Sequence, residues 1–470
     1  MLLKWVFYDI IEKNTMKILF KGMAMKTSNK LSRRDAIKAM GVVSTSLFGA
    51  SKLNAAPKLS MPSSHKKVRI VIVGGGTGGM IASARLRRSA PNAEIILIAP
   101  NATHLYQAGQ TFVAFGLNDQ ADNERPTADI LEDKVKWIQE SVTAFNPEKN
   151  SLKTDKDREV TYDYLVVALG VEYHYEAIKG LSKEQIGKDG ITSVYLNDTK
   201  IGKSSGGELT KEWFAAIKCS AREKPVKVLL SEPNGVIKGV GTSLDMLFLG
   251  SQMLENSKAV FTFTKADEKL FPFDGFAKVL KKRLQQQKNA TVLYGHNFIE
   301  IDSKKKIAIY EVDGKRVKIP YDFMHIVPPM QTPKVLRDSE LAIQTGEQKG
   351  YLNVNAKTLQ HKRYKNIFGL GDAVGLPFGK TGGSAQQQAI VIQDNLAAVI
   401  EAMKPPMEYN GYTVAPIKTE FGKVLLAEFN EKELLPTFML SPYKPRWIWW
   451  ELDLHVMRHA YFSLMMRGMM

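Results

Sequence analysis

The sequence predicts an α/β protein with two Rossmann-like dinucleotide-binding domains and C-terminal helices that associate with a membrane. Three observations lead to this prediction. A glycine-rich turn joins an apolar strand to a helix near residue 74, a second set of apolar strands fills the middle of the chain, and aromatic residues recur at helical spacing near the C-terminus. The 470 residues are enough for two or three domains, and the 44% hydrophobic content is typical of a globular protein.

The N-terminal region carries a pattern typical of an export signal. Its stretch SRRDAIK places Arg33 and Arg34 in the arrangement S-R-R-x-x-x-K, and the apolar run Ala39–Ala50 that follows is too short to span a bilayer. We therefore expect residues 1–56 to be a twin-arginine signal segment, with Met25 as the initiator. The protein would then be periplasmic and peripherally bound to the inner membrane. A surface helix with two exposed arginines is the alternative.

Charge and cysteine content exclude several classes of function. The net charge is +17, but residues 1–56 hold ten Lys/Arg against three Asp/Glu, which leaves 55 − 45 = +10 for the rest. This excess is spread thinly, so we expect no nucleic-acid partner, and it fits an anionic membrane surface better. The only cysteine is Cys219, so no intrachain disulfide and no thiolate zinc site can form. We expect Cys219 to be a half-buried structural residue and predict no metal site, because His455 and His459 lack acidic or cysteine partners at set spacing.

The first chemical motif is the turn that follows the apolar strand Val68–Val73. Gly74, Gly76 and Gly79 give G-x-G-x-x-G between this strand and a helix. The first glycine allows the tight turn, the second lets a pyrophosphate approach the backbone, and the third lets helix and strand pack closely. The N-terminus of the helix offers free N–H groups to the phosphates. The motif therefore predicts a dinucleotide site, with a purely structural turn as the alternative.

The second strand of this unit departs from the dinucleotide-binding pattern. An acidic residue is expected at its end, about 20 residues beyond the glycines, to bind ribose hydroxyls. Ala99 and Pro100 stand there instead. We expect Asn101 to supply the hydrogen bond in place of the acid.

The middle of the chain predicts a second Rossmann-like domain over residues 174–339. Its apolar strands are VKVLL, AVFTFT, TVLYG, KIAIY and MHIVPP. The first of them is followed by SEPNGVIKGVGTSL, which lacks G-x-G-x-x-G at the turn. Because the phosphate cradle is missing, we expect NADH not to be the electron donor.

A two-part cofactor site is completed by the stretch from Gly369 to Gly383. NIFGLGDAV reads as a strand that ends at Gly371 and Asp372, and a helix is expected from about Ser384. An aspartate at a strand end can bind a ribityl or ribose hydroxyl, while Lys380 and the helix N-terminus can stabilise negative charge on a reduced ring. With the first glycine motif, this predicts FAD, held by a discontinuous domain of residues 66–173 and 340–403.

The C-terminal region 404–470 predicts a surface for the membrane. An apolar stripe at helical spacing faces away from most of the charged side chains; its members are Trp447, Trp450, Leu454, Met457, Tyr461 and Leu464. Such a helix suits a membrane interface, and a core helix packed on the flavin domain is the alternative. Because the predicted flavin residues lie earlier in the chain, the sequence alone predicts that flavin stays bound when this helix is deleted.

Four segments resemble the sulfide:quinone oxidoreductases over nearly all of the chain beyond the signal. They are HLYQAG at 104–109, IVPPM at 326–330, TLQHKRYKNIFGLGD at 358–372 and GKVLLAEFN at 422–430. The flavocytochrome c sulfide dehydrogenase flavoproteins are a second resemblance. The resemblance implies the FAD/NAD(P)-binding fold of pyridine nucleotide-disulfide oxidoreductases, electron transfer through FAD to a membrane quinone, and docking of the C-terminal region on the membrane.

The redox cysteines that the resemblance implies are all missing. Gly239 stands in place of the cysteine of a K-C-A-G segment, Ala373 in place of the one after the flavin aspartate, and Ala415 in place of the one in a Tyr-Thr-Ser-Cys-Pro run. Only a thiolate can attack sulfur or relay electrons as a dithiol, and glycine and alanine can do neither. The catalytic residues are therefore unassigned.

The electron donor is also unassigned, with sulfide attacking the flavin directly as one candidate. An NADH:quinone oxidoreductase-like enzyme and a catalytically silent flavin-binding protein are the alternatives. A homo-oligomer, the quinone type and covalent attachment of FAD are left open.

Overall fold

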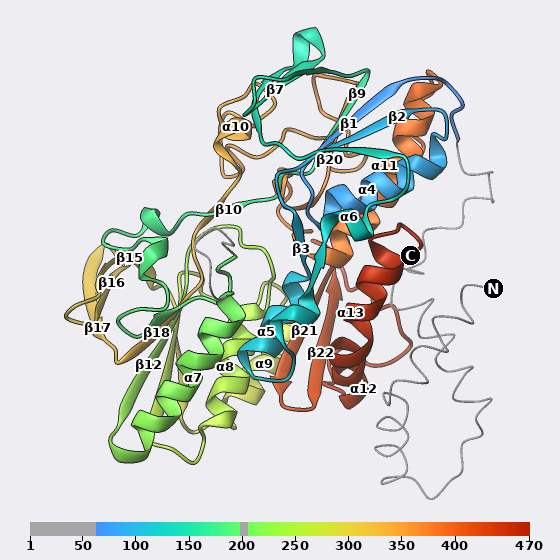
Figure 1. Cartoon of the computed structure of the whole chain (residues 1–470). Coiled ribbons are helices and arrows are strands. Elements are labelled where there is room, and N and C mark those ends of the chain that lie inside the picture. The colour runs from blue at the N-terminus through green and yellow to red at the C-terminus, as the bar shows by residue number, and fades with distance from the viewer. Residues whose placement is uncertain (1–62, 198–204) are drawn as a thin grey trace, which may run out of the picture.

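A computed structural model describes residues 63–197 and 205–470, so the predicted signal segment lies outside the described residues. The described chain forms two α/β halves, each built on a five-stranded parallel sheet, followed by a C-terminal hairpin and helix (Figure 1). The predicted fold class of two Rossmann-like domains is confirmed.

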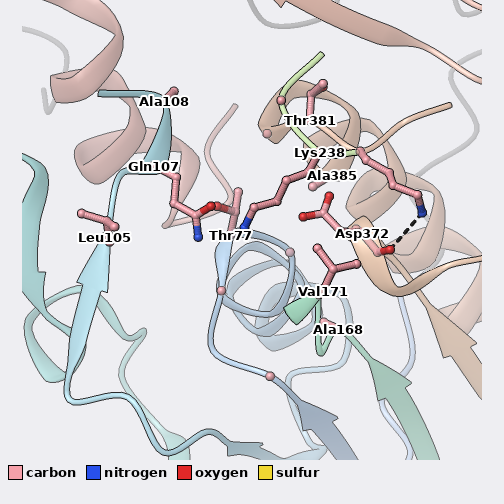
Figure 2. Close-up of a pocket in the computed structure, with 18 of the residues that line it drawn as sticks. Thr77, Leu105, Gln107, Ala108, Ala168, Val171, Lys238, Asp372, Thr381 and Ala385 are labelled. Carbon is pink, nitrogen blue, oxygen red and sulfur yellow. Dashed lines mark hydrogen bonds between the residues drawn. The ribbon is translucent and has the colours of Figure 1, made fainter. Parts of the chain in front are cut away.

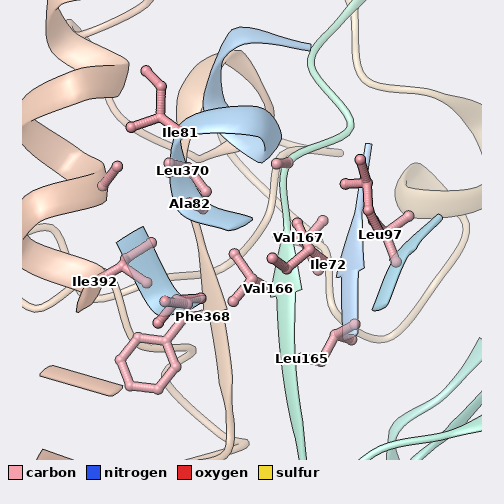
Figure 3. Packing of buried hydrophobic residues seen from close by; sticks show 14 of the residues in the cluster. Ile72, Ile81, Ala82, Leu97, Leu165, Val166, Val167, Phe368, Leu370 and Ile392 are labelled. Atoms are coloured by element: carbon pink, nitrogen blue, oxygen red, sulfur yellow. The ribbon is translucent and has the colours of Figure 1, made fainter. Parts of the chain in front are cut away.

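The first half is built from two stretches that lie far apart in the chain. Its sheet has the order β20 (Ile367–Gly369), β9 (Tyr164–Val167), β1 (Arg69–Val73), β2 (Glu94–Ile98) and β5 (Val135–Ile138). Every residue of the central strands after the first is buried, and helices α4 (Thr77–Ser89) and α11 (Gly382–Ile400), which lie side by side, cover the sheet (Figure 1). Figure 3 shows the contact: Ile81 of α4 points towards α11, and Ile392 of α11 lies next to Phe368 of β20.

Shorter elements complete the first half. They are the antiparallel sheet β6 (Val142–Asn146), β7 (Ser151–Thr154) and β8 (Glu159–Thr161), the pair β3 (Thr103–Leu105) and β4 (Glu124–Pro126), and the helices α5 (Gln110–Ala114), α6 (Thr127–Ile130) and α10 (Lys334–Arg337).

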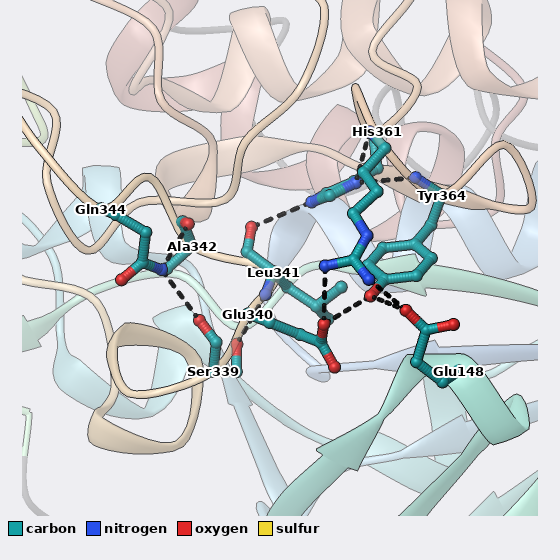
Figure 4. Close-up of polar contacts among 9 residues, drawn as sticks. Glu148, Ser339, Glu340, Leu341, Ala342, Gln344, His361 and Tyr364 are labelled. Carbon is teal, nitrogen blue, oxygen red and sulfur yellow. Dashed lines mark hydrogen bonds and ion pairs between the residues drawn. The ribbon is translucent and has the colours of Figure 1, made fainter.

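A surface network ties the early and late stretches of this half together (Figure 4). The Tyr364 hydroxyl oxygen lies 2.8 Å from Glu148 and 2.5 Å from Glu340, so its one proton is shared between the two carboxylates. Arg363 pairs with both carboxylates, at 3.0 Å from Glu340. Single exposed ion pairs contribute little, but one arginine and one phenol shared by two carboxylates form a network. The network joins the turn after β6 to the chain that returns from the second half.

The second half has a parallel sheet of its own. Its strand order is β11 (Ile191–Thr192), β18 (Phe323–Ile326), β12 (Val226–Glu232), β13 (Ala259–Lys265) and β14 (Ala290–Leu293). The helices are α7 (Gly206–Glu223), α8 (Thr242–Met253) and α9 (Asp274–Leu284). The stretch KIAIY differs from the expectation, because it belongs to a separate antiparallel sheet formed by β15 (Asn297–Asp302), β16 (Ile307–Val312) and β17 (Lys315–Pro320). The antiparallel pair β10 (Glu172–Tyr173) and β19 (Met330–Gln331) links the halves.

The C-terminal region consists of a hairpin and an irregular helix, which lie next to each other (Figure 1). The hairpin is β21 (Thr413–Glu420) and β22 (Lys423–Phe429), and β21 packs on α8. The helix runs as α12 (Trp447–Glu451), a π turn at Leu452–Val456, α13 (Met457–Ala460) and a second π turn at Tyr461–Met465. Among the helices of residues 63–197 and 205–470, none combines the length and apolar character needed to cross a bilayer.

Burial favours the core alternative for three of the six members of the predicted apolar stripe. Trp450, Leu454 and Tyr461 are all less than 9% exposed, whereas Trp447 is 50% exposed. The helix therefore packs on the protein along most of its length, and the apolar surface that it leaves to solvent lies near its start.

Candidate functional site

A cavity of about 1220 Å³ is bounded by both halves and by the C-terminal region. It exceeds the roughly 300–1,000 Å³ of ordinary small-ligand sites. Its wall includes the glycine turn, the loop around Asp372, the loop around Lys238, the hairpin β21–β22 and the C-terminal helix. Six of the seven cofactor-binding residues predicted from the sequence line it, and they are Gly74, Gly76, Asn101, Gly371, Asp372 and Lys380.

The three glycines of the turn have different geometric reasons to be glycine. Gly74 has φ +110°, and a Cβ there would lie 2.3 Å from the Ala168 carbonyl oxygen. A Cβ at Gly79 would lie 1.8 Å from the Gly74 oxygen, so this buried residue sets the packing of α4 on the turn and does not line the cavity. Gly76 has no heavy atom within 4 Å of its Cβ position and borders the cavity. Its bare backbone therefore leaves room for a ligand at the start of α4, where no side chain caps the helix.

Asn101 lies at the cavity edge beyond the end of β2. Its side chain is exposed, and its backbone oxygen accepts a 2.8 Å hydrogen bond from the Thr127 hydroxyl. The bond fixes the backbone of Asn101, so its amide stands where the acid of the dinucleotide pattern would be.

Lys380 fixes the loop that carries the flavin-type aspartate. Its Nζ donates to the backbone oxygens of Asp372, at 2.9 Å, and Val374, at 2.8 Å. Burial lowers the pKa of Lys380 to about 8, and Asp372 opposes this shift. Gly371, with φ +73°, permits the turn that sends the Asp372 carboxylate into the cavity (Figure 2). The loop is therefore held in shape by a buried cation.

Lys238 is a site residue that was not predicted from the sequence. It comes from the second half, its Nζ lies 4.7 Å from the centroid of the Tyr173 ring, and its side chain reaches towards the space around Asp372 and Thr77 (Figure 2). Burial alone would lower its pKa, but Tyr173 and Asp372 raise it above its usual value. Lys238 directly precedes Gly239, the position of a missing cysteine. A lysine next to that position is the sequence signal that could have predicted a cation in the cavity.

The C-terminal helix closes the cavity over the glycine turn. The Tyr461 hydroxyl lies 2.7 Å from both Thr77 Oγ1 and His104 Nε2, and His104 Nδ1 lies 3.1 Å from the Gly75 oxygen. Burial lowers the pKa of His104 to about 4, so its ring is neutral. Since a carbonyl oxygen can only accept, Nδ1 carries the proton and Nε2 accepts from Tyr461. The last helix of the chain is thus bonded to the first turn of α4.

Two of the three positions where the family has cysteines line the cavity, and the third does not. Gly239 and Ala415 line it, whereas Ala373 is fully buried and does not. Gly239 also has φ +68°, so a cysteine restored there would be strained. Cys219, the only cysteine of the sequence, does not line the cavity and is exposed on α7, so the expectation that it is half-buried is wrong. It lies on the solvent side of an amphipathic helix.

In the second half, an ion pair stands where a second dinucleotide would bind. Dinucleotides bind at the carboxyl ends of parallel strands, beside the start of the next helix. Glu232 ends β12, Lys265 ends β13, and Ser243 lies in the first turn of α8. Lys265 and Ser243 both donate to Glu232, and all three residues are less than 10% exposed. Within the described residues, no group of three or more His, Cys, Asp or Glu could hold a metal ion.

This architecture defines an enzyme of the pyridine nucleotide-disulfide oxidoreductase class, and the sequence model of the family described as "Pyridine nucleotide-disulphide oxidoreductase" matches residues 68–204. Within this class, the chain belongs to the sulfide:quinone oxidoreductase family, so the resemblance described above is confirmed. Members of the family bind FAD.

Two relatives carry this assignment, and one solved structure has the same fold. The chain is 32% identical over 435 residues to the mitochondrial sulfide:quinone oxidoreductase of Dictyostelium discoideum, with 91% of each chain covered. It is 30% identical over 407 residues to the mitochondrial sulfide:quinone oxidoreductase of Mus musculus, covering 85% of this chain and 86% of that one. The solved sulfide:quinone oxidoreductase of Aquifex aeolicus has the same fold, with a TM-score of 0.63, 22% identity, and 79% of this chain and 85% of that one covered.

Proposed function

We propose that this protein binds FAD and passes electrons from a donor that needs no protein thiol, through the flavin, to a membrane quinone. The observation that carries the proposal is the composition of one cavity. Its wall combines a dinucleotide-type glycine turn and the loop of Asp372 with apolar residues of the C-terminal region, and the only cysteine of the sequence does not line it. Flavin supplies two-electron chemistry, and the protein orients it and tunes its charge.

The residues on the cavity wall fit FAD. The uncapped start of α4 and the bare backbone of Gly76 suit a pyrophosphate, and Asn101 suits a ribose hydroxyl. The Asp372 carboxylate can accept a hydrogen bond from a ribityl hydroxyl. The buried ammonium of Lys380 can stabilise negative charge on the reduced flavin ring. Gly74, Gly79 and Gly371 shape the two turns.

The donor reduces the flavin without a thiol relay. Sulfide that attacks the flavin directly is the candidate that the names of the relatives support. NADH is disfavoured because Glu232 and Lys265 fill the second dinucleotide position.

Purified protein that has been reduced anaerobically with dithionite is expected to be reoxidised by a water-soluble ubiquinone analogue. Flavin absorbance followed by stopped-flow measures this directly. The same experiment on protein alkylated at Cys219 should give the same rate, because that thiol is remote from the cavity. Sulfide and NADH are then tested as reductants of the oxidised protein. Bound flavin that quinone fails to reoxidise would support a catalytically silent flavoprotein and overturn the proposal.

We further propose that the membrane surface meets the protein at the loop that precedes the C-terminal helix and at the first residue of that helix. Large apolar side chains are exposed there: Met439, Leu440 and Tyr443 in the loop, and Trp447 at the start of α12. Phe438, in the same loop, packs on Trp449 with ring centroids 4.6 Å apart, and Trp449 lines the cavity. Phe438 therefore connects the exposed loop directly to a residue of the cavity wall. This arrangement suits entry of an apolar quinone from the bilayer.

Replacing Met439, Leu440 and Trp447 together with glutamate is expected to abolish binding to anionic vesicles. The changes remove buried apolar area from the bilayer and add charge that anionic lipids repel. Co-sedimentation with vesicles measures the effect, and flavin content reports whether the fold is kept. Val260→Glu is the matched control, because Val260 is 51% exposed on β13 and outside this loop. Sedimentation of the triple variant equal to that of the control would refute docking through this loop.

We also propose that the protein is exported to the periplasm and binds the inner membrane there, on the basis of the twin-arginine pattern at Arg33 and Arg34. Cell fractionation of an Arg33→Lys, Arg34→Lys variant tests this. Periplasmic protein at the wild-type level would contradict it.

A further inference from the structure

Three buried ionic side chains meet on the wall of the cavity. Asp245 comes from α8, Lys418 from β21 and Asp453 from the π turn Leu452–Val456, and all three line the cavity. Lys418 Nζ lies 2.9 Å from Asp453 Oδ2 and 3.3 Å from Asp245 Oδ2. Asp245 Oδ1 also accepts a 2.7 Å hydrogen bond from the Lys418 backbone N–H. Each side chain is 7% exposed or less.

The charges of this Asp245–Lys418–Asp453 cluster do not balance. Two carboxylates and one ammonium leave one net negative charge, and burial penalises an uncompensated charge. Burial raises the pKa of Asp245 to about 7, with Lys418 opposing the shift. Burial alone would lower the pKa of Lys418, but the two carboxylates raise it well above its usual value, so the lysine stays charged. The cluster therefore holds one exchangeable proton near neutral pH.

The side chains that contact the cluster do not change their protonation near neutral pH. Tyr195 faces Asp245, and Tyr106 faces Asp453 and Arg458; burial raises the pKa values of both phenols well above the usual value. Arg458 pairs with Asp122 at 2.9 Å. The side chains of α5 that contact the cluster do not titrate: Thr111 donates to Asp245 at 3.4 Å, and the Phe112 ring lies 5.1 Å from Lys418 Nζ.

The cavity wall beside the cluster is apolar and includes an aromatic side chain. Its members come from the hairpin and the C-terminal helix, and they are Val424, Leu426, Trp449, Leu452 and Met457. Glu428, farther along β22, accepts hydrogen bonds from the Tyr412 hydroxyl, at 2.6 Å, and from the Thr437 backbone N–H. An apolar ring that carries oxygen atoms matches this surface, with the cluster as its polar partner.

We propose that the Asp245–Lys418–Asp453 cluster donates a proton to the quinone as it is reduced. This inference rests on the proposed function. Reduction to the quinol takes up two electrons and two protons, of which the reduced flavin supplies both electrons and one proton. The second proton comes from the cluster: the O–H bond of an aspartic acid breaks and an O–H bond forms on a quinone oxygen. The cluster then regains its proton from solvent.

The test is the rate at which a water-soluble ubiquinone analogue reoxidises the reduced protein between pH 5.5 and 9. In the wild type we expect a plateau at low pH and a tenfold fall per pH unit above about pH 7, where Asp245 loses its proton. Asp245→Asn cannot donate a proton, so its rate should be about 100-fold lower at pH 6 and should lack this break. Lys380, whose pKa is about 8, titrates in the same cavity and should remain visible in the variant.

Asp274→Asn is the matched control, because it makes the same chemical change at an exposed surface pair with Lys269. It should keep the wild-type rate and pH profile. If Asp245→Asn fails to fold, the wild-type profile still decides, since a rate without a break between pH 6 and 8 overturns the proposal. A folded Asp245→Asn protein that keeps the wild-type rate and profile overturns it as well.

A second readout needs no turnover. Infrared difference spectra between pH 6 and pH 8 should contain the band of a protonated carboxyl group that disappears at high pH, and Asp245→Asn should lack this change. Absence of the band from the wild type would overturn the proposal. The two proposals fail differently: quinone that never reoxidises the wild type refutes the function, whereas equal reoxidation of wild type and variant refutes only the role of the cluster.

Discussion

Replacing Gly76 with valine is expected to yield a folded protein without flavin. The backbone of Gly76 is extended, with φ −74° and ψ −172°, so a β-branched residue fits it without strain. The Cβ position has no protein atom within 4 Å and borders the cavity, so the added side chain would enter space that a pyrophosphate needs. The flavin absorbance of the purified protein and the thermal unfolding midpoint of wild-type apoprotein and variant measure the two parts of the prediction.

Gly79→Ala separates loss of the ligand from loss of the fold. A Cβ there would meet the Gly74 oxygen at 1.8 Å, so this variant should unfold at a lower temperature even in the apoprotein. Gly76→Val should instead match wild-type apoprotein in its unfolding midpoint. A Gly76→Val protein that purifies with a full complement of flavin would contradict the assignment of the turn.

Local sequence signals predicted the parts of the site that are local in the chain. The glycine turn, the strand end at Asp372 and the lysine eight residues later each lie within one short segment, and the structure brings them to one cavity. These signals arise because a tight turn, a helix N-terminus and a strand end have fixed residue requirements.

The remaining wall could not be predicted because its members are assembled from distant segments. Asp245, Lys418 and Asp453 come from three elements and share no spacing pattern. The signal that could have found them is a charged residue within an otherwise apolar segment, as in TSLDMLFLG and TVAPIKTE. Residues of this kind are rarely buried unless they are paired, so each predicts a partner elsewhere in the fold.

The C-terminal stripe shows a limit of periodicity. An apolar helical face looks the same in sequence whether it meets a protein core or a membrane interface. The two π turns also change the direction of side chains along the helix, and Asp453 and Tyr461, which both reach the cavity, lie in them. A regular 3.6-residue period cannot predict these positions, and π turns are frequent at functional sites.

Deleting the chain from Trp447 onward is expected to destroy both the fold and flavin binding, contrary to the prediction from the sequence alone. The segment buries eight large side chains, and they are Trp449, Trp450, Leu452, Leu454, Tyr461, Phe462, Met465 and Met466. Each contributes about 1.5–3 kcal/mol when fully buried, whereas a whole domain is stable by only about 5–15 kcal/mol. The deletion also leaves Lys418 without Asp453 and removes Tyr461 from Thr77 and His104.

The matched control for this deletion is a shorter one that stops after Met466. It keeps every one of those eight side chains and removes only the last four residues, whose backbone oxygens accept bonds from Arg85 and Arg88. We expect the short variant to retain flavin with a lowered unfolding midpoint, and the long variant to be recovered as insoluble protein or as soluble protein without flavin. Thermal unfolding and flavin absorbance measure both outcomes. A long variant that purifies soluble with bound flavin would show that the helix is a detachable membrane anchor. In that case Tyr461 and Asp453 would have no part in closing the cavity, and docking would have to be assigned to the helix itself instead of the loop before it.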